Sequence, residues 1–195
     1  SQELLPIPAK SHYTFNLRDV SKVFQGILMV KPIACQNQER MIKLWIHEIS
    51  RVFHDRLIND EDKLWFNKAT IKTTTEVFRM NWEFDDIFTE EPLMWGDFMR
   101  KGVDQADKIY EQVSDTTRMG MLMNQYMEEY VIDGKGQMDL VFFKDALEHI
   151  SRICRILRQE RGNAMLVGVG GSGRQSLTRL SAFIMNSDVF QIDTS

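Results

Sequence analysis

The stretch Gly168-Val-Gly-Gly-Ser-Gly-Arg-Gln-Ser176 decides how the last part of the chain folds. It follows a short apolar run, residues 164–167, and precedes residues 174–185, whose apolar positions have helical spacing. A second apolar run, residues 189–192, comes after that helix. Strand, glycine loop, helix and strand is the setting in which backbone N–H groups and a helix N-terminus surround a phosphate group. We therefore predict a phosphate-binding loop of altered P-loop type, placed to receive a nucleotide such as ATP.

Two motifs fit the spacing of the glycines in this loop. For a P-loop, Gly168 and Gly173 have the required separation, but Lys and then Ser or Thr should follow them. For a dinucleotide-binding fingerprint, Gly168, Gly170 and Gly173 match completely, and an acidic residue is expected where the second strand ends. Asp188 and Asp193 lie near that point. The spacing alone leaves both motifs open, as well as a glycine turn that binds no ligand.

Two residues of the loop depart from the usual P-loop. Arg174 stands in the place of Lys and keeps a positive charge, but its planar guanidinium differs from a compact ammonium. Gln175 replaces the hydroxyl that coordinates Mg²⁺, and Ser176, one residue later, is rotated by about 100° around the helix. Because hydrolysis relies on that metal to neutralise developing charge, we predict nucleotide binding with weak or absent hydrolysis.

The chain before residue 161 has the periodicity of successive helices. The first should begin near Thr14 or Asn16, either of which can cap it, and end before Pro32. Its apolar positions recur at the spacing of one helical face, formed by Leu17, Val20, Phe24, Ile27 and Leu28. Four further helices are predicted over the ranges 37–57, 61–78, 102–130 and 139–158.

The change of pattern near residue 161 predicts two domains. Residues 1–160 should be a mainly α unit, and residues 161–195 the beginning of an α/β P-loop domain. The second is too short to cover both faces of a parallel sheet, so we expect more of that domain beyond Ser195.

The composition argues against several classes of function. A net charge of −4 gives no overall field for nucleic acid or an anionic membrane, and no apolar run approaches the roughly 20 residues of a membrane span. Cys35 and Cys154 form no metal-spaced cluster and suit a reducing compartment. We interpret the acidic residues of the range 85–91 as a solvated loop, and the four histidines as cap or surface residues. We expect no metal site among these side chains, and neither nucleic acid nor membrane as a partner.

The glycine loop and the N-terminal segment together resemble the dynein heavy chains, of the axonemal kind. The resemblance rests on Lys10–Asp19 (KSHYTFNLRD), Val23–Leu28 (VFQGIL), Leu44–Glu48 (LWIHE) with Val52–Leu57 (VFHDRL), and Gly162–Leu180 (GNAMLVGVGGSGRQSLTRL). These stretches span nearly the whole chain, although residues 60–140 are less distinctive. Two long motifs in the family's order make the resemblance specific.

The resemblance implies an ATP-driven, minus-end-directed microtubule motor built on a ring of six AAA+ modules. Residues 16–19 resemble the helical lid of the third module, and Arg18 falls at the family's sensor-2 arginine, which reaches that module's nucleotide. Residues 168–176 resemble the opening of the fourth module, with the Arg-Gln variant of axonemal relatives. The implied nucleotide-binding residues are Gly168, Val169, Gly170, Gly171, Ser172, Gly173, Arg174, Gln175 and Ser176.

The resemblance also implies ligands, partners and a location. ATP or ADP is the expected ligand, with Mg²⁺ only weakly supported because of Gln175. Expected partners are the other AAA+ modules of the same chain, dynein intermediate and light chains, and microtubules, in the cytoskeleton of a ciliary or flagellar axoneme within the cytoplasm. The segment alone should be inactive as an ATPase, because the Walker-B strand, sensor 1 and arginine finger lie outside it.

Two functions from other classes remain open. One is an NAD(P)-dependent oxidoreductase with a helical N-terminal domain, in which Asp193 would contact the cofactor. The other is an interaction module whose helices bind a partner while the glycine loop is silent.

Overall fold

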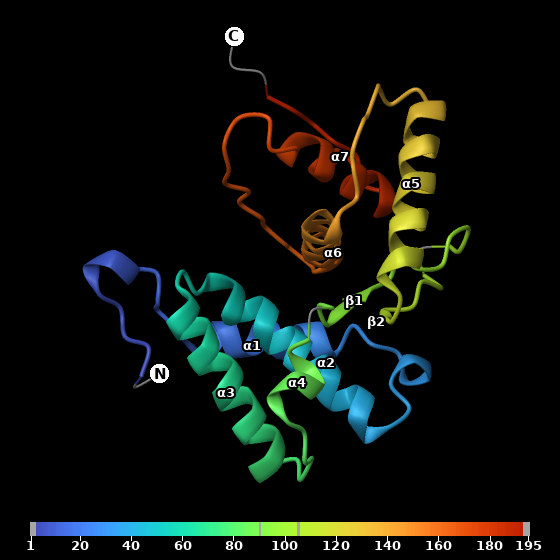
Figure 1. The fold of residues 1–195 in the computed structure, drawn as a ribbon. Coiled ribbons are helices and arrows are strands. Elements are labelled where there is room, and N and C mark those ends of the chain that lie inside the picture. Colours follow the sequence, from blue (N-terminus) through green and yellow to red (C-terminus); the bar gives the residue numbers. More distant parts are fainter. Residues whose placement is uncertain (1–2, 90, 105, 193–195) are drawn as a thin grey trace. The chain divides into compact units, whose positions relative to one another are not determined.

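The computed structural model describes residues 3–89, 91–104 and 106–192 of the chain. It divides into two compact units, Ser1–Trp95 and Gly96–Ser195, and both are built mainly from helices (Figure 1). This confirms the predicted mainly α fold class. The predicted domain boundary near residue 160 does not coincide with this division and stays a prediction about modules. In the part of the chain described, no helix is both long and apolar enough to cross a membrane.

The first unit consists of helices joined by short turns. Its elements are η1 (Pro8–Lys10), α1 (Leu17–Ile27), η2 (Pro32–Ala34), α2 (Gln38–Val52), η3 (His54–Arg56), α3 (Asp60–Glu76) and α4 (Phe84–Ile87). The strand β1 (Met94–Gly96) lies at its C-terminal limit.

Helix α1 begins at a capping box. The side chain of Asn16 accepts hydrogen bonds from the backbone N–H groups of Arg18 and Asp19, at 2.9 and 3.4 Å. The carboxylate of Asp19 in turn accepts the N–H of Asn16 at 3.1 Å. Of the two predicted caps, the structure therefore uses Asn16, because Asp19 stands at the third helical position and completes the reciprocal bond.

The apolar face predicted for α1 is mostly exposed, and of its five residues only Ile27 packs against the core. Leu17, Phe24 and Leu28 are 85%, 60% and 81% exposed. The buried apolar residue of α1 is instead Val23, which packs against Ile49 and Val52 of α2. The apolar periodicity predicted the helix correctly. However, α2 packs against a different face of α1 from the face that carries the most apolar residues.

Two polar groups in the interior of the first unit hold its segments together. Tyr13, 2% exposed, donates its hydroxyl hydrogen to Asp62 at 2.8 Å and accepts the N–H of Ile58 at 3.0 Å. His47, 1% exposed, donates from Nδ1 to the carbonyl of Leu93 at 2.9 Å. The prediction that all histidines are cap or surface residues is thus wrong for His47. Its hydrogen bond to Leu93 offsets the cost of removing the imidazole N–H from water.

The second unit contains β2 (Glu111–Val113), α5 (Thr116–Ile132), α6 (Lys144–Arg158) and α7 (Arg174–Ile184). Helix α6 lies against both α7 and α5, and its buried core residues include Ile150 and Cys154. Helix α5 contributes the fully buried side chains of Met119 and Met123, which suit irregular gaps.

Two predicted helices of this unit begin later than expected. The helix predicted over 102–130 begins only at Thr116, because Asp115 caps it by accepting the N–H of Arg118. The helix predicted over 139–158 begins at Lys144. The apolar residues before each start belong to loops, where helical spacing carries no information.

The two predicted strands, 164–167 and 189–192, do not form in the structure, whereas the predicted helix between them does, as α7. Apolar side chains of both runs are exposed, with Met165 and Phe190 at 88% and 89%. A strand needs a hydrogen-bonded neighbour, and the described residues place no strand beside either run.

Candidate functional site: the glycine loop

The glycine loop adopts a conformation that glycine alone adopts easily. Gly171 and Gly173 have φ values of 77° and 75°, in the left-handed region. Gly173 is also the residue that precedes the first turn of α7, and no side chain caps that turn. The first N–H groups of α7 have no carbonyl of their own helix to bond. Together with the helix dipole, they make this end of α7 suited to an anion.

The first half of the loop is closely folded. A Cβ atom on Gly168 would lie 2.9 Å from the Ser172 hydroxyl oxygen and 3.5 Å from Cδ of Arg174. The N–H of Ser172 donates to the carbonyl of Val169 at 3.3 Å. Gly170, by contrast, has open space on the Cβ side. The backbone angles of Gly171 and Gly173 favour glycine, whereas a Cβ on Gly168 would require the exposed side chain of Ser172 to shift.

The loop bounds an open cavity of about 680 Å³. Its lining residues are Leu166, Gly170, Gly171, Ser172, Gly173, Arg174, Gln175 and Ser176. Most of the predicted loop residues thus come together at one cavity, whereas Gly168 and Val169 do not line it and act by shaping the turn.

Arg174 supplies the charge among the residues that line this cavity. Its side chain is half-buried, and Nη2 donates to the carbonyl of Val169 at 3.1 Å. The guanidinium group therefore lies over the loop and retains further N–H donors for a ligand. A planar guanidinium group can donate two parallel N–H hydrogen bonds to two oxygens of one phosphate group.

The donors of the cavity fit a phosphate group better than a metal ion. Backbone N–H groups and Arg174 favour negative charge, and no carboxylate lines the cavity among the described residues. Gln175 is exposed and Ser176 half-buried at the start of α7. Elsewhere in the described part of the chain, no three His, Cys, Asp or Glu side chains are grouped to hold a metal ion.

Leu140 is a contact of the loop that sequence reasoning missed. Its Cδ2 atom lies 3.7 Å from the position that a Cβ on Gly173 would take. The periodicity placed Leu140 inside a helix, but α6 begins four residues later, at Lys144. An apolar, half-buried side chain therefore lies beside the N-terminus of α7.

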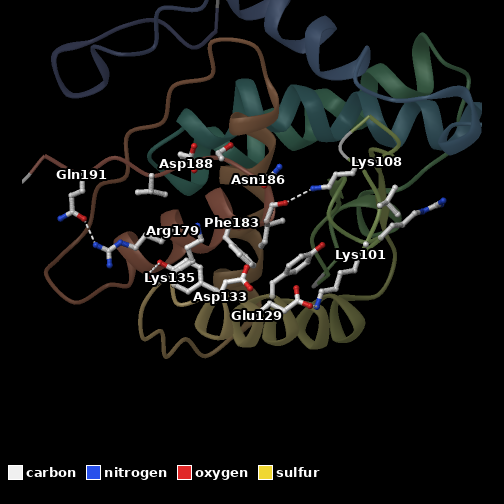
Figure 2. Close-up of a pocket in the computed structure, with 18 residues that line it drawn as sticks. Lys101, Lys108, Glu129, Asp133, Lys135, Arg179, Phe183, Asn186, Asp188 and Gln191 are labelled. Carbon is white, nitrogen blue, oxygen red and sulfur yellow. Dashed lines mark hydrogen bonds and ion pairs between the residues drawn. The ribbon is translucent and has the colours of Figure 1, made fainter.

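Asp188, a candidate acid of the dinucleotide motif, lies far from the loop. It lines a second cavity, of about 770 Å³, together with residues of α5 and the C-terminal part of α7 (Figure 2). The 11 residues of α7 separate this cavity from Gly173, and at 1.5 Å per residue the helix is about 16 Å long. Asp188 is thus at the wrong end of α7 for a ribose bound at the loop. Asp193 lies outside the described residues.

Three of the basic side chains that line this second cavity bond neighbouring groups. Lys101 pairs with Glu129 at 2.6 Å, and Arg179 donates to the side chain of Gln191 at 2.6 Å. Lys108 donates to the carbonyl of Ile184 at 2.9 Å, as Figure 2 shows.

Arg18 belongs to the first unit, as the second residue of α1. Its side chain is exposed, and its backbone N–H bonds the cap residue Asn16. Its role at the nucleotide of a preceding module stays a prediction.

Comparison with known families gives two matches along the chain. The model described as an AAA+ lid domain matches residues 1–92, and the model described as the P-loop containing dynein motor region D4 matches residues 138–195. The second match contains the glycine loop, Leu140, and helices α6 and α7.

Individual relatives match over essentially all of the chain. Dynein axonemal heavy chain 6 of Homo sapiens is 46% identical over 195 residues, which are 100% of this chain and 5% of that protein. Dynein axonemal heavy chain 1 of Homo sapiens is 47% identical over the same share of the chain and 4% of its own length. Dynein axonemal heavy chain 12 of Mus musculus is 43% identical over 205 residues, 98% of this chain and 7% of that protein. The chain thus spans only about a twentieth of such relatives, and it belongs to the dynein heavy chain family, of the axonemal type.

Proposed function

We propose that this chain is part of the AAA+ ring of an axonemal dynein heavy chain, an ATP-driven, minus-end-directed microtubule motor. Residues 1–160 would include the helical lid of the third module, and residues 161–195 would open the fourth. The order of the two family matches, lid first and motor region D4 second, supports this placement.

At the glycine loop, the proposed function is to bind ATP or ADP. The observation that carries this proposal is the start of α7, where the uncapped N–H groups and the guanidinium of Arg174 meet at one open cavity. Gly168 and Val169 shape the turn, and Gly170 to Ser176 surround the phosphates. Leu140 packs beside Gly173 and supports the start of α7.

Hydrolysis at this loop is proposed to be weak or absent. Gln175 occupies the position at which a hydroxyl would coordinate Mg²⁺. Without a carboxylate or a hydroxyl at that position, a metal ion would depend on the phosphates and on water for its ligands. Bound nucleotide would then act by ordering the loop, and the chain would couple neighbouring modules.

The lid is proposed to use the exposed face of α1. Leu17, Phe24 and Leu28 form an apolar surface that a neighbouring part of the ring would cover. Arg18, on the same helix, would reach the nucleotide of the third module. By analogy with axonemal relatives, the complete protein would work with intermediate and light chains on microtubules of a cilium or flagellum.

The test is nucleotide binding to a protein that continues beyond Ser195 through the complete fourth module. Fluorescent ATP and ADP should both bind in the presence of Mg²⁺. Arg174→Ala should weaken binding by about tenfold or more, since a charge-assisted hydrogen bond to phosphate contributes about 1.5–3 kcal/mol. Arg179→Ala, on the same helix but bonded to Gln191, is the matched control.

The outcomes of this test separate the proposals. If neither nucleotide binds at millimolar concentration, nucleotide binding at the loop is refuted. If Arg174→Ala binds as tightly as the control, Arg174 loses its assigned role. Binding of NADH in place of ATP and ADP would favour the oxidoreductase alternative.

A further inference from the structure

A single segment of the second unit, residues 97–104 and 106–113, contacts the C-terminal ends of both helices next to the glycine loop. Asp97 forms an ion pair with Arg158, the last residue of α6. Lys108 donates to the carbonyl of Ile184, the last residue of α7. The glycine loop lies between these two helices in the sequence, so the segment contacts the chain on either side of it.

The two side chains of this segment that contact the helix ends are buried. Asp97 is 2% exposed and Lys108 is 8% exposed. The guanidinium carbon of Arg158 also lies 5.8 Å from the ring centroid of Tyr110, within the range of a cation–π contact. Phe98, fully buried, accepts a hydrogen bond from the hydroxyl of Tyr126 at 3.1 Å. Held on α5 and α6 in this way, the segment is a fixed support.

Lys108 is suited to hold α7 in place along its axis. The last carbonyls of a helix have no N–H partner in their own helix, and the helix dipole makes that end negative. An ammonium group at that end donates a hydrogen bond to one unpaired carbonyl. Its positive charge also interacts favourably with the negative end of the helix dipole. Because α7 is a continuous helix from Arg174 to Ile184, fixing its last residue limits how far its first turn can shift.

We propose that Lys108 and Asp97 are positioning residues for the glycine loop. Neither lines the cavity at the loop. They act through α7 and α6, by holding the uncapped start of α7 where a phosphate can meet its N–H groups. The inference rests on the proposed nucleotide binding, and it adds two residues that neither the motif nor its spacing identifies.

The experiment is hydrogen exchange with mass spectrometry on the complete heavy chain, which reports on this loop separately from other modules. The variant Lys108→Met keeps the aliphatic chain and removes the donor, and Lys108→Arg restores a charged donor. Lys101→Met is the matched control, because Lys101 comes from the same segment and lines the same cavity but forms a partly exposed ion pair with Glu129. Peptides that cover residues 168–180 are followed without nucleotide and during titration with ADP.

We expect Lys108→Met to speed exchange in the first turn of α7, where Leu177 bonds Gly173, even without nucleotide. It should also raise the ADP concentration for half-protection on the order of tenfold, as expected for one lost hydrogen bond to a charged group. Lys108→Arg should restore most of both effects, and Lys101→Met should change neither. Asp97→Asn should produce the same pattern through α6.

The inference is overturned if folded Lys108→Met and Asp97→Asn both exchange like Lys101→Met over residues 168–180. It is equally overturned if exchange rises evenly over α5, α6 and α7, since that pattern means a general loss of stability. A wild-type loop that ADP fails to protect would refute the proposed function, while exchange without nucleotide would still decide the roles of Lys108 and Asp97.

Discussion

At the scale of the residue, Gly173 combines two requirements. Its φ of 75° places the chain in the left-handed region, and its position directly before α7 leaves the first N–H groups of the helix uncapped by any side chain. Asn or Ser at that position would cap the helix and compete with a phosphate for the same N–H groups. Gly173 thus contributes to the anion site both by its backbone angles and by lacking a side chain.

A prediction follows for two glycines of the loop. Gly173→Ala should destabilise the second unit by about 1 kcal/mol or more, because a side chain strains a left-handed backbone. Gly170→Ala should be nearly neutral, since Gly170 has no positive φ and nothing lies within 4 Å of a Cβ there. Urea denaturation of the two variants measures the difference. Equal stabilities would contradict the loop geometry.

The two cysteines should differ in reactivity. Burial raises the pKa of the Cys154 thiol to about 12, and the nearby carboxylate of Asp97 adds to the effect. Cys35 is only half-buried, although burial raises its pKa as well. Because the thiolate is the reactive form, iodoacetamide at pH 8 should modify Cys35 in the native protein and Cys154 only after unfolding. Mass spectrometry of the alkylated peptides checks this, and rapid native labelling of Cys154 would contradict it.

At the scale of the element, the helix starts follow local chemistry. Four helices begin after Asn16, Asn37, Asn59 and Asp115, and in each the side chain accepts a backbone N–H of the first turn. Such caps involve residues two or three apart in the sequence. The starts of the first three helices could therefore be predicted closely. The start at Thr116 could not, because apolar residues at helical spacing continue on the N-terminal side of its cap, Asp115.

The cap of α1 gives a test at this scale. Asn16→Ala removes the acceptor for two N–H groups and should lower the stability of the first unit by about 1 kcal/mol. Thr14→Ala is the control, because Thr14 is exposed and was the other predicted cap. Thermal unfolding followed by circular dichroism compares them. If Thr14→Ala proves the more destabilising, the capping box at Asn16 is not what begins the helix.

At the scale of the whole molecule, one carboxylate ties distant parts of the first unit together. Asp62 of α3 accepts hydrogen bonds from Lys10 at 2.5 Å and Tyr13 at 2.8 Å. The bond from Lys10, followed by that from Tyr13, lowers the pKa of Asp62 below its ordinary value of 3.8, against the opposing effect of burial. A carboxylate with a lowered pKa in the folded state contributes stability above its unfolded pKa, and this contribution is lost as pH falls through the folded value.

Acid should therefore weaken the first unit through Asp62. All four tryptophans of the sequence lie in residues 1–95, so tryptophan fluorescence follows this unit during urea denaturation. Between pH 5 and pH 2, wild-type stability should fall, and Asp62→Asn should show a lower stability at pH 5 with a shallower fall. Parallel pH curves for the two proteins would mean that Asp62 is not the titrating group.

The sequence by itself determined the mainly helical class, the glycine loop and the helix that follows it. It also determined the family, because these depend on spacing and on residues close to one another along the chain. Only the tertiary structure decided which face of α1 is buried, that Leu140 lies beside Gly173, and that Lys108 holds the far end of α7. These contacts join residues far apart in sequence, and local periodicity carries no information about which surfaces meet. The two predicted strands failed for the same reason, since a strand forms only where a neighbouring strand supplies its hydrogen bonds.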